Sequence, residues 1–170
     1  MDLITALALV IGLLGGLATY VFLSPFGYGL QIWAAFLGWA SFYHCGGKGE
    51  GLKASVLGNL WGVLWGALTL AAVTKMGMAD SLSLPVWAGI CVAVGVGLMI
   101  LGAKIPGLGS IPAQVYGYAA TVAFTLLTNA TGAMGTPSIA NPIAVIALSL
   151  ILGNILGYIS EAIAGSLARA

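Results

Sequence analysis

The chain has 170 residues, of which 61% are hydrophobic and only 5% are charged, and its net charge is +1. A soluble globular domain carries about 25% charged residues, so five basic and four acidic side chains cannot cover a water-facing surface of this size. The composition therefore excludes an ordinary soluble domain, and the small net charge gives no electrostatic basis for binding nucleic acid. We expect residues 1–170 to form a single transmembrane domain with the lipid bilayer as its solvent.

Six apolar segments follow one another along the chain, separated by charges, prolines and polar clusters. Each approaches the length of about 20 residues that a helix needs to cross the hydrocarbon core, although the second and fifth are the shortest. Continuous rather than alternating apolar runs predict helices, not a barrel. The predicted fold is an all-α membrane protein with six transmembrane helices, at residues 3–23, 29–45, 53–74, 83–103, 112–129 and 140–165.

Lysine and arginine are unevenly distributed over the two sides that six spans create. The side with both termini carries Lys48, Lys53, Lys104 and Arg169, whereas the other side carries only Lys75. Because basic residues accumulate in cytoplasmic loops, this pattern predicts that both termini lie in the cytoplasm.

The two halves of the chain carry related patterns in the same order. The first and fourth segments are rich in glycine, and each is followed by a proline. A Gln-aliphatic-aromatic pattern then occurs at residues 31–33 and 114–116, and a Gly-Asn-aliphatic-x-Gly pattern at residues 58–62 and 153–157. Three spans in each half give the halves opposite orientations, as in transporters and channels built from inverted repeats. We therefore predict two inverted three-helix repeats, at about residues 1–75 and 82–166.

Polar side chains within the spans are the candidates for a pore or substrate path. An amide deep in hydrocarbon is costly unless it is hydrogen-bonded, so Asn59 and Asn154 either line a polar path or bond to neighbouring helices as packing contacts. Glu161 is the only acid well inside a predicted span; it is either a transport or proton-transfer residue or an interfacial carboxylate that pairs with a loop lysine.

Three further candidates lie near the ends of the predicted spans. His44 either titrates near neutral pH at an opening or is simply solvated. Gln31 and Gln114 either hydrogen-bond a polar solute in a mouth or cap a helix.

Glycine spacing predicts where helices pack most closely. Gly58, Gly62 and Gly66 lie on one face of the third segment, and Gly153 and Gly157 lie on one face of the sixth. Small residues at this interval let helix backbones approach each other. A close crossing at the centre of the domain also brings the two asparagines together.

The sequence shows no pattern for catalysis or for a cofactor. It contains no Ser-His-Asp set, no metal-ligand spacing and no phosphate-binding glycine loop in a strand-to-helix context. Cys45 and Cys91 are interpreted as ordinary buried small residues. We therefore expect no enzyme activity, no metal and no cofactor.

The stretch Phe36-Leu37-Gly38-Trp39-Ala40-Ser41-Phe42, together with the small size and six spans, resembles the YcdZ-like group. This group is an uncharacterised family of small bacterial inner-membrane proteins, and the likeness extends across most of the chain. The resemblance implies a bacterial inner (cytoplasmic) membrane, and it brings no catalytic residues.

These patterns favour a channel or facilitator for a small neutral or weakly polar solute, with a path between the third and sixth segments. The spans carry few charges that can compensate a charged solute, although backbone carbonyls beside glycines can coordinate an ion. The alternative is a non-transporting scaffold or accessory subunit, in which the Gly-Asn-Gly segments only pack. A membrane enzyme is the third hypothesis, and the expected partners are the bilayer, the solute and further copies of the chain in a homo-oligomer.

Overall fold

A computed structural model describes residues 1–169, and its regular structure is helical. The long helices are α1 (Leu3–Leu23), α2 (Ile32–His44), α3 (Lys48–Lys75), α5 (Leu84–Leu101), α6 (Ile111–Leu127) and α7 (Pro142–Arg169). Between them lie the short helix α4 (Ala79–Leu82) and 3₁₀ turns at Pro25–Gly27, Gly102–Lys104 and Thr131–Ala133. The all-helical part of the prediction is therefore confirmed.

Four of these helices are long and apolar enough to cross a membrane: α1, α3, α7, and α5 together with the turn that follows it. The helices α2 and α6 have 13 and 17 residues, which correspond to about 20 and 26 Å against a hydrocarbon core of about 30 Å. Leu9, Leu13 and Leu17 on α1 expose 49–68% of their surface, as expected for a face that does not meet water. The chain is thus compatible with a multi-pass membrane protein.

Side-chain caps mark the start of three of the long helices, α1, α6 and α7. At α1, the Asp2 carboxylate accepts hydrogen bonds from the Thr5 hydroxyl at 2.6 Å and the Thr5 N–H at 3.0 Å, and these bonds lower the pKa of Asp2. At α7, the Asn141 side chain accepts from the Ile143 N–H at 2.9 Å, and Pro142 occupies the first helical position, where its missing donor costs little.

Helix α3 begins at Lys48, five residues before the expected start at residue 53. Gly46 and Gly47 have φ values of +92° and +68°, a conformation that glycine adopts without strain, so the chain reverses between α2 and α3 within a few residues. Lys53 therefore lies in the second turn of the helix rather than at its first residue.

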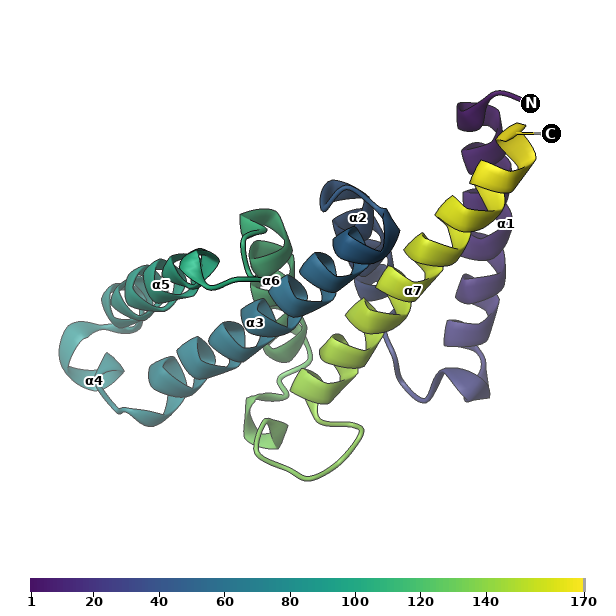
Figure 1. Cartoon of the computed structure of the whole chain (residues 1–170). Helices are drawn as coiled ribbons and strands as arrows, with labels where there is room; N and C mark the ends of the chain where they lie inside the picture. The colour runs from purple at the N-terminus through teal and green to yellow at the C-terminus, as the bar shows by residue number, and fades with distance from the viewer. Residues whose placement is uncertain (170) are drawn as a thin grey trace.

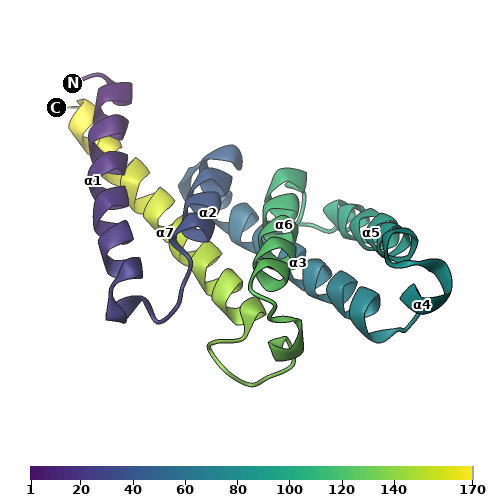
Figure 2. The same cartoon turned by 180° about the vertical axis from the view of Figure 1, so that it is seen from behind.

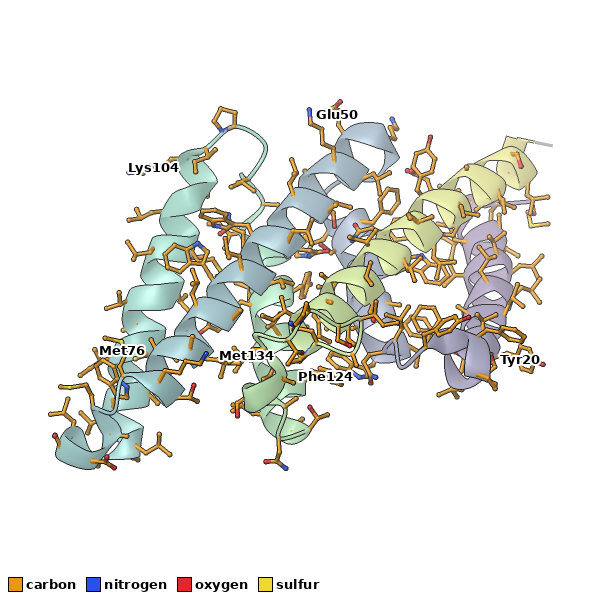
Figure 3. The ribbon with its side chains drawn as sticks, turned by 90° about the horizontal axis from the view of Figure 1, so that it is seen from below. Tyr20, Glu50, Met76, Lys104, Phe124 and Met134 are labelled. Atoms are coloured by element: carbon orange, nitrogen blue, oxygen red, sulfur yellow. The ribbon has the colours of Figure 1, made fainter. Side chains whose placement is uncertain are left out.

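The helices form an elongated row with α1 and α5 at opposite ends (Figures 1 and 2). α3 and α7 cross in the middle; α1 and α2 pack on α7, whereas α5 and α6 pack on α3. Figure 3 shows Glu50 and Lys104 at the end of the bundle that holds both chain termini, which we call the terminal end, and Tyr20, Met76 and Met134 at the opposite, distal end.

The two closest helix crossings are made by glycines. At each crossing, one glycine from each helix lies against a backbone carbonyl of the other helix, so that an added Cβ would overlap that oxygen. The pairs are Gly62 with Gln114 and Gly117 with Asn59 between α3 and α6, and Gly153 with Ala35 and Gly38 with Leu150 between α7 and α2. Gly58, Gly66 and Gly157 also face these neighbouring helices.

Candidate functional site

Asn59 and Asn154 meet where α3 crosses α7. The Asn154 Nδ2 donates a hydrogen bond to Asn59 Oδ1 at 2.8 Å, across a sequence separation of 95 residues. Their exposed fractions are 1% and 0%, so the two amides lie in the interior of the bundle. This contact joins the corresponding positions of the two Gly-Asn-x-x-Gly patterns.

Two serines extend this contact into a polar cluster that joins four helices. Asn59 Nδ2 donates two further hydrogen bonds, to the Ala113 carbonyl of α6 at 2.9 Å and to Ser41 Oγ of α2 at 3.1 Å. Ser55 Oγ in turn donates to Ser41 Oγ at 2.6 Å. We call Ser41, Ser55, Asn59 and Asn154 the central polar cluster; all four side chains are buried and uncharged.

The two serines of this cluster were not among the residues expected from the sequence. Ser55 precedes Asn59 by one helical turn and therefore shares its face, which is a signal the sequence contains. Ser41 lies on α2, and its place beside Asn59 depends on how α2 packs against α3 and α7. The local sequence holds no comparable signal for it.

Two buried amide oxygens have no hydrogen-bond partner within the described residues: Asn154 Oδ1 of the central polar cluster and Gln114 Oε1 of α6. Both amide nitrogens are engaged, because Asn154 Nδ2 also donates to the Leu150 carbonyl at 2.9 Å and Gln114 Nε2 donates to the Leu108 carbonyl at 2.6 Å. A buried acceptor without a partner costs about 1–3 kcal/mol. Each oxygen is thus ready to accept a hydrogen bond from a donor that enters the bundle.

An apolar layer fills the bundle on the distal side of the central polar cluster. Its fully packed members are Ala34, Val63, Ala120, Ile146 and Leu150, none more than 3% exposed. Val63 follows Asn59 on α3, which runs toward the distal end, and Leu150 precedes Asn154 on α7, which runs away from it (Figure 3). The polar groups are therefore separated from the distal end by packed hydrocarbon.

Glu161 lies at the terminal end, where it caps α3. Its Oε2 accepts a hydrogen bond from the backbone N–H of Lys48 at 2.7 Å, and its carboxylate lies against Gly47. A negative charge at a helix N-terminus is favourable because the first N–H groups are unpaired and the helix dipole is positive there. The contact is with Lys48, as in the interfacial alternative, but through its backbone rather than its ammonium group.

Replacing Glu161 by alanine is expected to destabilise the fold by about 1 kcal/mol, the usual effect of losing a helix cap. Glu161→Gln retains an acceptor at the same place, so it is expected to lose only part of this stability. The measurement is the sodium dodecyl sulfate content of mixed micelles at which half of the helical circular dichroism signal is lost. An unchanged midpoint in the alanine variant contradicts the capping role.

Gln31 and His44 lie at opposite ends of α2 and do not reach the central polar cluster. Gln31 precedes the first residue of α2, donating from Nε2 to the Gly29 carbonyl at 2.7 Å and accepting from Trp33 Nε1 at 3.1 Å. His44 is exposed at the terminal end, with Nδ1 at 3.2 Å from the Tyr116 hydroxyl. The structure thus brings Asn59 and Asn154 together beside the α6 turn that carries Gln114, and leaves the other three candidates apart.

One family matches nearly the whole length of the chain. It is described as a protein of unknown function (DUF1097), and the match covers residues 8–165. No curated protein and no solved structure matches the chain. The matched range contains the central polar cluster, both glycine crossings and Glu161. The chain therefore belongs to the DUF1097 family, which is an uncharacterised family.

Proposed function

We propose that this protein is a membrane channel or facilitator for a small neutral solute, and that the conformation described here is closed. The observation that carries the proposal is the central polar cluster, in which Asn154 Oδ1 has no partner, together with the unpartnered Gln114 Oε1 of α6. A bundle that only needs to pack in lipid has no requirement for free acceptors at its centre, because unsatisfied polar groups oppose burial.

The arrangement of the helices supports two inverted repeats of three spans each. Exchanging α1 with α5, α2 with α6 and α3 with α7 converts every main packing pair into another observed pair. The two short helices, α2 and α6, then occupy corresponding positions. In transporters with inverted repeats, short or interrupted helices at corresponding positions lie at the binding site. Here both short helices contact Asn59, α2 through Ser41 and α6 through the Ala113 carbonyl.

The chemistry of the site favours a neutral solute that donates hydrogen bonds. No member of the central polar cluster is charged, so a charged solute would lose its hydration without replacement. Among the unpartnered buried side-chain atoms, the two amide oxygens, Asn154 Oδ1 and Gln114 Oε1, can only accept hydrogen bonds. Amides, ureas and small alcohols carry the complementary N–H or O–H groups.

The apolar layer at Val63, Ile146 and Leu150 is the closed gate in this proposal. A constriction lined by hydrocarbon excludes water and polar solutes until the helices move apart. Opening then requires α3 and α7 to shift on the distal side, while the glycine crossings hold α6 and α2 against them.

The proposed setting is a bacterial inner membrane with the terminal end in the cytoplasm. Lys48, Lys53 and Lys104 lie toward that end, and positive charge marks cytoplasmic loops; the bacterial origin rests on the resemblance to the YcdZ-like group. A homo-oligomer, with one path in each protomer or a shared one, completes the proposal and is tested by the mass of the complex in native mass spectrometry.

The direct test is solute entry into liposomes that contain the purified protein, followed by light scattering. Formamide, urea and glycerol are the probes. We expect faster entry of at least one probe than into empty liposomes, and a return to the empty-liposome rate for Asn154→Leu. Thr121→Val is the matched control: its hydroxyl is equally buried but bonds to the Gly117 carbonyl, outside the central polar cluster, so its rate should stay near that of the wild type.

The close glycine crossings favour one alternative, a non-transporting scaffold or accessory subunit. In that case the asparagines serve only to join helices. Liposomes with folded wild-type protein then show no more entry than empty liposomes for any probe, and the transport proposal is abandoned.

A further inference from the structure

A groove between α3 and α5, remote from the central polar cluster, has a volume of about 230 Å³. Its walls are apolar almost throughout and include Trp65, Thr69, Ala72, Trp87, Cys91 and Val94. An apolar cavity of about 150 Å³ already accepts a benzene-sized molecule. The groove is therefore large enough for a length of hydrocarbon chain.

The groove opens sideways, toward the surface that faces lipid in a membrane. Leu68, Ile90 and Val94 line it and are themselves 49%, 44% and 56% exposed. Both of its helices are among those long and apolar enough to cross a membrane. The molecules that meet this opening are then lipid acyl chains rather than water.

A buried polar group without a partner lies in the wall of the groove. Thr69 is 5% exposed, and its hydroxyl forms no hydrogen bond within the described residues. The hydroxyl lies against Gly95 of α5, which also lines the groove and has no side chain at that place. An unpartnered donor in an apolar wall suits an occupant with an apolar body and a carbonyl oxygen, such as the ester of a phospholipid.

A basic side chain lies at the distal mouth of the groove. Met76 lines the groove and lies at the distal end (Figure 3), and Lys75 directly precedes it as the exposed last residue of α3. Thr69 lies six residues before Lys75, or about 9 Å along the helix. A phosphate at Lys75 and an ester near Thr69 are thus compatible with one lipid whose chain continues toward Trp65.

We propose that the α3/α5 groove binds one acyl chain of an anionic phospholipid, whose phosphate pairs with Lys75. This lipid site is independent of the transport proposal. It also accounts for Lys75, the lysine that lies at the distal end, opposite the other basic residues. An anionic headgroup attracts a basic side chain at the membrane surface.

The test uses the full chain in vesicles that contain phosphatidylglycerol with a photoactivatable group on its acyl chain. After irradiation, the labelled residues are mapped by mass spectrometry. We expect labelling concentrated at residues 65–76 and 87–95, above the labelling of the exposed leucines of α1. Lys75→Gln should reduce labelling of the groove about fivefold, as expected from one basic residue at an anionic surface, whereas Lys104→Gln, at the terminal end, should leave it unchanged.

A second pair of variants tests the groove itself. Ala72→Leu places three more carbons in the groove and should displace the chain, whereas Ala71→Leu adds the same volume at a position that does not line it. Three outcomes overturn the proposal. The groove and α1 are labelled equally, Lys75→Gln and Lys104→Gln have equal effects on groove labelling, or a phosphatidylcholine probe labels the groove as strongly as the phosphatidylglycerol probe. Should Ala72→Leu fail to fold, the exposed Lys75→Gln variant decides.

Discussion

Gly62→Ala is expected to destabilise the bundle by about 3 kcal/mol, although alanine is otherwise the better helix former. The added Cβ would overlap the backbone carbonyl of Gln114, and a backbone atom cannot move aside as a flexible side chain can. α3 and α6 must therefore separate, and the Asn59 hydrogen bond to the Ala113 carbonyl lengthens with them. The measurement is unfolding in mixed micelles of increasing sodium dodecyl sulfate content.

The matched control for this substitution is Gly97→Ala in α5, where an added Cβ meets no atom within 4 Å. That variant should be unchanged or stabilised by up to about 1 kcal/mol, since alanine has the higher helix propensity. Gly153→Ala, which faces the Ala35 carbonyl at the other crossing, should resemble Gly62→Ala. Equal stability of Gly62→Ala and Gly97→Ala would show that α3 and α6 do not cross as closely as described.

Asn59→Asp is expected to destabilise the protein by about 3 kcal/mol at pH 7, the order found for an acidic side chain at the centre of a membrane helix. The carboxylate has no N–H to donate to Ser41 or to the Ala113 carbonyl, and it places negative charge against that carbonyl oxygen. The carboxylate can accept from Asn154 Nδ2 and from the Ser41 hydroxyl, but the Ala113 carbonyl loses its donor. The same detergent titration measures the loss.

Asn129→Asp is the control for the added charge. Asn129 is exposed in the segment after α6 and has a φ of +53°, a conformation that aspartate also tolerates, so little change is expected. A double-mutant cycle of Asn59→Leu and Asn154→Leu should give a coupling of about 1 kcal/mol, within the range for hydrogen bonds between membrane helices. Equal losses for Asn59→Asp and Asn129→Asp would show that Asn59 is not buried in the bundle.

Helix content and most helix ends were predictable because they depend on local properties. The bounds of α1 agree with the expected segment 3–23, since an aspartate precedes it and a proline follows it. The start of α3 was placed too late, because Lys48 and Glu50 were assigned to a loop although Gly46 and Gly47 had already completed the turn. Hydropathy marks where apolar residues end, and a capped helix continues beyond that point.

The candidate site was only partly predictable, because some of its contacts join helices that are distant in sequence. Asn59 and Asn154 stood out because an amide among apolar residues is rare and costly, and they do contact each other. The cap formed by Glu161 on α3 and the place of Ser41 in the central polar cluster depend on contacts between helices distant in sequence. No pattern within a single helix encodes such pairings.

The sequence alone determined that this protein is helical and apolar, because the ratio of charged to apolar residues and the length of each apolar run depend only on local composition. Tertiary structure decided which faces meet: glycines let α3 approach α6 and α7 approach α2, and those approaches bring two distant amides within hydrogen-bonding distance. It also decided that packed hydrocarbon lies on the distal side of those amides. The reason is physical, since the orientation of one helix against another depends on packing over its whole surface, which no short stretch of residues determines.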